Sequence, residues 1–200
     1  MDLRSRGERP YVICGMLALI VFVAAAIAID IIDPNWTFGP NALSEMSVSP
    51  VPGVKELFAC ACAVTGLLAM AFGVGKMLFE KNWAYIGGAL AIGAGFFIML
   101  VGLIPADVLE PHNYAAGLMV IFLAGAIILA TVNEILDGSR FMLVFGIAIG
   151  LLALSTSFLP LGFAEVAGIL CGILWFIVHF IRYFLRGFRC TTPDDKVWCP

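Results

Sequence analysis

Six long runs of apolar residues constrain this 200-residue chain more than any other feature. A helix that crosses a bilayer needs about 20 mostly apolar residues, because each residue rises about 1.5 Å through a hydrocarbon core about 30 Å thick. Six stretches meet this requirement, and they cover residues 11–29, 57–78, 83–104, 114–132, 141–159 and 163–184. The fold class predicted is an all-α integral membrane protein, a six-transmembrane-helix bundle.

The composition excludes several other classes of protein. Hydrophobic residues make up 62% of the chain and charged residues 12%, whereas about a quarter of a soluble domain is charged. The net charge of −3 supplies no basic surface for nucleic acid. We therefore expect one transmembrane domain over residues 1–185 and a short cytoplasmic tail over residues 186–200. The first apolar run, about 19 residues long, exceeds the apolar core of a signal peptide and should be an anchor.

The distribution of Lys and Arg predicts the orientation of the bundle. Six spans place both termini on one side, and ten of the eleven basic residues fall there. These are Arg4, Arg6, Arg9, Lys76, Lys81, Arg140, Arg182, Arg186, Arg189 and Lys196; Lys55 falls on the other side. Basic loops stay in the cytoplasm, so we expect cytoplasmic N- and C-termini in a multi-pass protein of the cell membrane.

Small residues at helical spacing indicate where helices approach closely in lipid. They occur as a stripe in the third span and as Gly-x-x-x-Gly pairs in the last two spans: Gly87, Ala91 and Gly95; Gly146 and Gly150; Gly168 and Gly172. Packing within one chain explains these positions. A homodimer or a membrane-protein partner held through either pair is the alternative.

The connection at about residues 30–54 is the one long loop, and it contains four of the ten prolines. A loop of this length in a compact protein is usually functional or folded on itself. Trp36 and Phe38 are suited to the level of the lipid headgroups. Residues 40–46 could form one short helical turn, and Glu45, between apolar neighbours, needs a partner.

Polar residues gather at the predicted outer face and form a candidate ligand site. The candidate ligand-binding residues are Asp30, Asn41, Ser44, Glu45, Asp107, His112 and Glu165, and Asp33 and Asn113 lie in the same region. Ionisable groups near hydrocarbon usually face a partner or a wet cavity. The alternative is that acidic residues simply occupy the translocated side, with Glu165 favoured at a helix N-terminus.

Polar residues near the predicted inner face receive simpler interpretations. Asn133, Glu134 and Asp137 are expected to be solvated at the inner end of the fourth span. Arg182, Arg186 and Arg189 form one basic helical face suited to anionic headgroups.

No known catalytic motif is present in the sequence, and no cofactor or metal is predicted. The two histidines fall on opposite sides of the predicted topology. The leading hypothesis is a non-enzymatic protein with an outward-facing polar pocket, under the 30–54 loop, that binds a lipid headgroup or small ligand. The alternatives are a subunit of a larger membrane complex and a membrane-embedded hydrolase that uses Ser44, His112 and an outer carboxylate.

Several short motifs together resemble a known family. They are Asn41-Ala-Leu-Ser-Glu-Met46 after an aspartate-proline and aromatic segment, Leu57-Phe58, Gly102-Leu-Ile-Pro105 before His112, and Gly162-x-x-Glu165. With them the chain resembles, over most of its length, the prokaryotic membrane family called domain of unknown function 998. Glu45, Ser47 and Ala59 depart from the family's usual aspartate, glycine and asparagine. The resemblance implies a six-helix fold and a distant similarity to Sfk-type and autophagy-modulator membrane proteins, whose roles involve lipids and stress responses. It implies no defined reaction.

Overall fold

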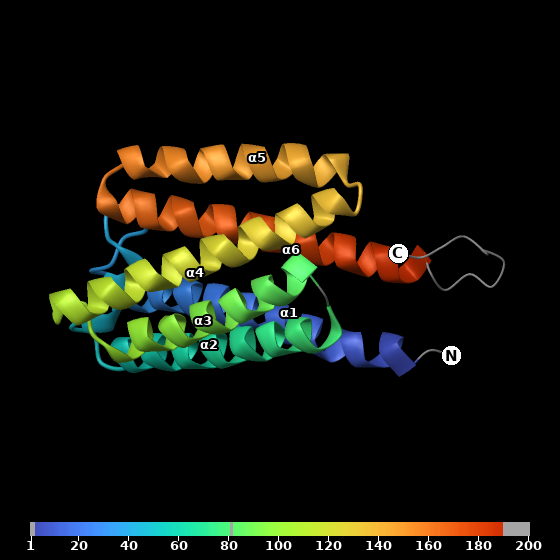
Figure 1. Ribbon diagram of the computed structural model, residues 1–200. Helices are drawn as coiled ribbons and strands as arrows, with labels where there is room; N and C mark the ends of the chain where they lie inside the picture. The colour runs from blue at the N-terminus through green and yellow to red at the C-terminus, as the bar shows by residue number, and fades with distance from the viewer. Residues whose placement is uncertain (1–2, 81, 190–200) are drawn as a thin grey trace.

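The computed structural model describes residues 3–80 and 82–189, and within them six long apolar helices run back and forth (Figure 1). The long helices are α1 (Leu3–Ile32), α2 (Val54–Phe79), α3 (Asn82–Leu103), α4 (Leu109–Leu136), α5 (Arg140–Ser155) and α6 (Leu161–Arg189). Two short 3₁₀ helices, η1 (Leu43–Val48) and η2 (Thr156–Phe158), lie between them. The six predicted spans are confirmed, each long and apolar enough to cross a membrane.

The helix ends differ from the predicted spans by a few residues. α4 begins at Leu109, five residues before the predicted start, because a proline in the first turn loses no helical hydrogen bond and Pro111 can be included. The fifth span tightens into η2 after Ser155. α6 continues to Arg189, and residues 190–200, which hold most of the predicted tail, lie outside the described part of the chain.

The two ends of the bundle are different in character (Figure 1). We call the end that carries the 33–53 loop the loop end, and the end where α1 begins and α6 ends the terminal end. α1 packs extensively on α2, α2 on α3 and α3 on α4, whereas α5 and α6 make fewer contacts with the other helices. α5 lies at the edge of the bundle, and large apolar side chains such as Val144 and Leu154 are exposed on it.

Glycines bring α2 and α3 into backbone contact. A Cβ atom on Gly95 would lie 2.6 Å from the Gly66 carbonyl oxygen, and one on Gly73 would lie 2.6 Å from the Gly88 carbonyl oxygen. Both distances are far too short for a real side chain, so only glycine permits this approach. Gly95 belongs to the predicted stripe of small residues, whereas the partners on α2 were not predicted.

The glycine pairs predicted for a dimer have mixed surroundings. Gly146 packs on the Thr131 side chain of α4, within the same chain. Around Gly150 and Gly172, no atom of the described residues lies within 4 Å of a Cβ position. The homodimer stays a prediction.

The 33–53 segment is folded on itself and closes the loop end. Trp36 is 6% exposed, and its indole N–H donates to the Ala42 carbonyl at 2.9 Å. It packs in a cluster with Ile29, Leu43 and Met46. The prediction that Trp36 lies at the headgroups is therefore wrong, because this side chain is part of the protein core. The short helical turn is confirmed as η1.

Replacing Gly95 by alanine should destabilise the bundle by about 1–3 kcal/mol, because the new methyl group overlaps the α2 backbone. The measurement is the free energy of unfolding in mixed micelles. Gly117→Ala on α4 is the matched control, since its Cβ would meet no described atom within 4 Å. That change should be neutral or stabilising, because alanine favours a helix over glycine. Equal effects of the two changes would contradict the glycine contact.

Candidate functional site

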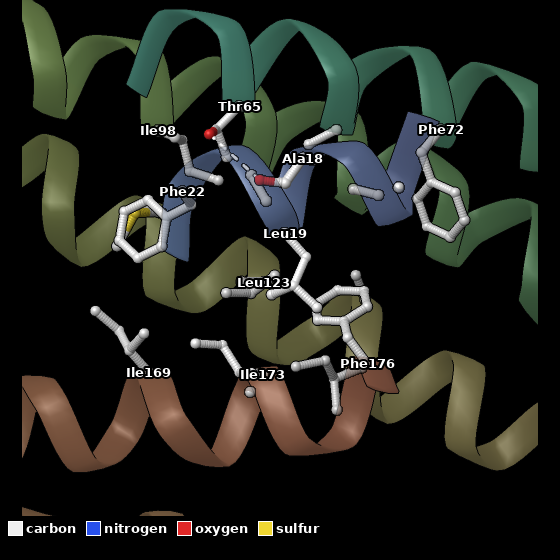
Figure 2. A pocket seen from close by; sticks show the side chains of 18 of the residues that line it. Ala18, Leu19, Phe22, Thr65, Phe72, Ile98, Leu123, Ile169, Ile173 and Phe176 are labelled. Carbon is white, nitrogen blue, oxygen red and sulfur yellow. Dashed lines mark hydrogen bonds between the residues drawn. The ribbon is translucent and has the colours of Figure 1, made fainter. Parts of the chain in front are cut away.

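An elongated cavity of about 170 Å³ lies inside the bundle, between α6 and the group formed by α1, α2, α3 and α4. Figure 2 shows Leu19 of α1 and Ile173 of α6 pointing into it from opposite sides. Along α2 the lining extends from Phe58 to Lys76, which corresponds to about 27 Å of helix rise. The cavity therefore follows most of the hydrocarbon thickness of a bilayer.

Small residues leave this space open. Ala91 and Ala94 of α3, Ala126 of α4 and Gly172 of α6 all line the cavity. A larger side chain at any of them would project into it, and around Gly172 there is free room for one. The cavity therefore exists because the side chains at these positions of the facing helices are small.

The cavity is apolar over nearly all of its surface, unlike the polar pocket expected from the sequence, and most of its few polar lining residues lie near its two ends. Ser44 and Glu165 line the loop end, and Lys76 and His179 line the terminal end. Between them Thr65 is the polar lining residue, and its hydroxyl donates to the Ala18 carbonyl at 3.4 Å (Figure 2).

At the loop end, two carboxylates hold η1 in place. Glu165 Oε2 accepts the Leu43 backbone N–H at 3.0 Å, which ties η1 to α6. Glu45 Oε1 accepts the Ala42 N–H at 3.1 Å, and Glu45 Oε2 accepts from Asn41 Nδ2 at 2.8 Å. The partner expected for Glu45 is therefore present, and it is the start of η1.

His112 is buried near Glu165. It is 3% exposed, and its Nδ1 lies 2.6 Å from the Ile104 carbonyl oxygen. A carbonyl only accepts, so Nδ1 carries a hydrogen and donates it to Ile104. Within the described residues Nε2 has no hydrogen-bond partner, although His112 interacts electrostatically with Glu165.

The structure brings together some of the predicted ligand-binding residues and separates others. Ser44 and Glu165 line the cavity, Asn41 and Glu45 support η1 beside it, and His112 lies near Glu165. Asp30 and Asp107 are exposed and are not among the lining residues. Within the described ranges no group of three or more His, Cys, Asp or Glu residues could hold a metal ion.

Two serines that sequence reasoning missed fix the loop. Ser49 donates to Asp33 Oδ2, and the Asn35 N–H donates to Asp33 Oδ1 at 2.9 Å. Ser47 Oγ donates to the Ser44 carbonyl at 2.6 Å and accepts the Ala106 N–H at 2.9 Å, which ties η1 to the α3–α4 connection. The Asp-Pro-Asn segment was the available signal for a side-chain turn of this kind.

The terminal end contains a second buried polar group. Glu134 is 5% exposed, and its Oε2 lies 3.2 Å from Arg182 Nη2, which also donates to Ser139 Oγ at 2.7 Å. His179 Nδ1 lies 3.7 Å from Glu134 Oε1. The expectation that Glu134 is solvated is wrong, because α6 covers it and supplies its cation.

The other polar pair at this end joins α1 and α2. Lys76 lies 2.9 Å from Glu80, and the Tyr11 hydroxyl donates to the same carboxylate at 2.9 Å. The cation that lines the terminal end of the cavity is therefore neutralised within the protein.

Fold and site define a multi-pass α-helical membrane protein with a mostly apolar cavity between its helices, to whose lining the first loop contributes Leu43 and Ser44. A family model described as a protein of unknown function, DUF998, matches residues 14–182. The chain belongs to this family, as its motifs suggested. No match was found among curated proteins or among solved structures.

The stability of the loop should depend on acidic pH through Asp33. The Ser49 hydroxyl and the Asn35 amide hold the pKa of Asp33 below its ordinary value of 3.8. The ionised Asp33 carboxylate therefore stabilises the folded loop fully above pH 3.8. This stabilisation is lost as the pH falls from that value through the lower pKa that Asp33 has in the folded protein. The unfolding temperature should therefore fall more steeply between about pH 6 and about pH 3 in the wild type than in Asp33→Asn. Asp30→Asn, which removes an exposed carboxylate nearby, should retain the wild-type profile. Parallel profiles for wild type and Asp33→Asn would refute the role of Asp33.

Removing the buried carboxylate at the terminal end should destabilise the bundle strongly. Glu134→Ala leaves Arg182 without its counter-charge, and we expect a loss of about 3 kcal/mol in the free energy of unfolding. In an Arg182→Ala background the same change should have a much smaller effect. Additive effects in this double-mutant cycle would show that the two groups do not stabilise each other.

Proposed function

We propose that this protein binds a membrane lipid by holding the lipid's apolar chain inside its bundle, beneath the 30–54 loop. The observation that carries the proposal is the elongated, mostly apolar cavity with most of its few polar lining residues near its two ends. Apolar cavities of about 150 Å³ stay dry and take up small apolar molecules. In a membrane, lipid chains are the apolar molecules at hand.

The proposed orientation has the termini in the cytoplasm of a cell and the loop end facing outward, as the Lys and Arg distribution supports. We further propose that the polar group of the lipid lies at the loop end, within reach of Ser44 and Glu165. Asn41 and Glu45 act by holding η1 over this opening. The proposed role is binding, so Ser44 is assigned no catalytic step.

A photoreactive lipid tests the cavity directly. The full chain is reconstituted with a phosphatidylcholine that carries a diazirine in one acyl chain, irradiated and mapped by mass spectrometry. Adducts are expected on cavity residues such as Ile169 and Ile173. Gly172→Phe places a ring in the cavity and should reduce these adducts about fivefold or more. Gly150→Phe, on exposed α5 and outside the lining, is the matched control and should leave them unchanged.

Exposed residues give an internal standard and define the failing result. Phe158 and Leu161 face outward and should be labelled equally in every variant. Labelling confined to such positions, or cavity labelling that is unchanged by Gly172→Phe, would overturn the proposal. If the lipid does not label the bundle and another protein copurifies with it at fixed stoichiometry, the result would instead support the alternative that this chain is a subunit of a larger complex.

A further inference from the structure

We propose that the ligand of the cavity is a lipid with a single apolar chain, such as a fatty acid, a fatty alcohol or a lysophospholipid, rather than a two-chain phospholipid. This inference rests on the proposed function and adds the class of lipid that the cavity selects. It follows from the small mean width of the cavity and from the side chains that set this width.

The volume of the cavity is small for its length. The volume is about 170 Å³, and the lining follows α2 over about 27 Å of helix rise. A cavity of about 150 Å³ accommodates one benzene molecule. A similar volume extended over about 27 Å is therefore a narrow tube. Carbon atoms of neighbouring chains pack about 4 Å apart, so a second chain alongside the first would need that much more width along the tube.

Stripes of side chains from five helices surround this tube. On α2 the lining residues recur every three or four positions and therefore share one face of the helix. They are Phe58, Cys62, Thr65, Ala69, Phe72 and Lys76. Faces of α1, α3, α4 and α6 supply most of the remaining wall, and every lining residue is buried or half-buried. A two-chain lipid can therefore place one chain in the tube only while its other chain stays outside the bundle.

Aromatic side chains on two facing helices hold the width of the tube. Phe72 of α2 is buried and packs against the rings of Tyr11 and Phe180, with both centroid distances 5.8 Å. Trp175 of α6 is buried, and its indole N–H donates to Thr131 Oγ1 at 3.0 Å. Both lining rings are thus fixed by neighbours, so the tube cannot widen here without moving packed side chains.

A pair of photoreactive lipids tests the inference on the full chain. Lysophosphatidylcholine and diacyl phosphatidylcholine, with the same diazirine in one acyl chain, are each added at the same low mole fraction to nanodiscs of unlabelled diacyl phosphatidylcholine that hold the protein. The readout is the ratio of adducts on Ile169 and Ile173, which line the cavity, to adducts on Phe158 and Leu161, which face outward. This ratio corrects for the amount of each lipid in the bilayer.

The ratio should be about tenfold higher for the one-chain lipid, because the diacyl lipid must hold its second chain outside the bundle. Where no one-chain lipid is present, the diacyl lipid still inserts one chain, since it surrounds the protein in large excess. Gly172→Phe should lower the cavity adducts of both lipids.

A wider tube should weaken this preference. Phe22 lines the cavity and also a neighbouring space of about 10 Å³, and it shares both linings with Leu43, Phe58 and Cys62. Phe22→Ala removes part of the wall between the two spaces, and the preference should fall to about threefold or less. Phe96→Ala removes an exposed ring of α3 outside the lining and should retain the wild-type preference.

The outcomes separate the inference from the proposed function. Equal ratios for the two lipids in the wild type, or a higher ratio for the diacyl lipid, overturn the inference; if Gly172→Phe still lowers the cavity adducts, lipid binding in the cavity stands. A preference that is unchanged in Phe22→Ala also overturns it, because width would then not be its cause. If neither lipid labels the cavity, or Gly172→Phe has no effect, the proposed function fails and the inference with it.

Discussion

The backbone contact between α2 and α3 is the constraint on which the rest of the bundle depends. No hydrophobic force draws apolar helices together in lipid, so association requires close packing. Gly66 against Gly95, and Gly73 against Gly88, provide it by bringing each helix to the carbonyl oxygens of the other. α1 then packs on α2 and α4 on α3, which produces a firm four-helix group. α6 contacts this group more sparsely, and the cavity lies between them.

Small residues therefore have two opposite consequences in one fold. Where they face each other across α2 and α3 they allow contact, and where Ala94 of α3, Ala126 of α4 and Gly172 of α6 line the cavity they leave space. Empty space inside a protein forfeits the dispersion attraction that a filled core would provide. The apolar chain of the proposed lipid would restore these contacts and would thereby stabilise the packing of α6 on the other helices.

Hydropathy was sufficient to predict the six spans, because the length and apolarity of a spanning helix are local properties. The short helical turn at Leu43–Val48 was predictable for the same reason. The burial of Glu134 was not predictable, because α6, which is distant in the sequence, covers it; the burial of Trp36 was not predictable, because it depends on how the loop folds back on itself. The cavity likewise depends on how five helices meet. The seven-residue spacing of glycines in both the second and the third span was a usable signal for the α2–α3 contact. Of the candidate site, Ser44 and Glu165 were predicted because polar residues in an apolar chain are few.

The hydrogen-bond balance distinguishes the two ends of the cavity. At the terminal end the charged side chains pair within the chain. Glu80 accepts hydrogen bonds from Lys76 and Tyr11, and Glu134 accepts one from Arg182. At the loop end Glu165 accepts the Leu43 N–H, and Glu45 accepts the Ala42 N–H and the Asn41 side-chain amide. The charged groups at the terminal end are thus paired within the chain, whereas Ser44 and Glu165 at the loop end are the polar groups that the proposed lipid would meet. That difference, rather than the apolar lining common to both halves, is the reason that the proposed lipid has its polar group at the loop end.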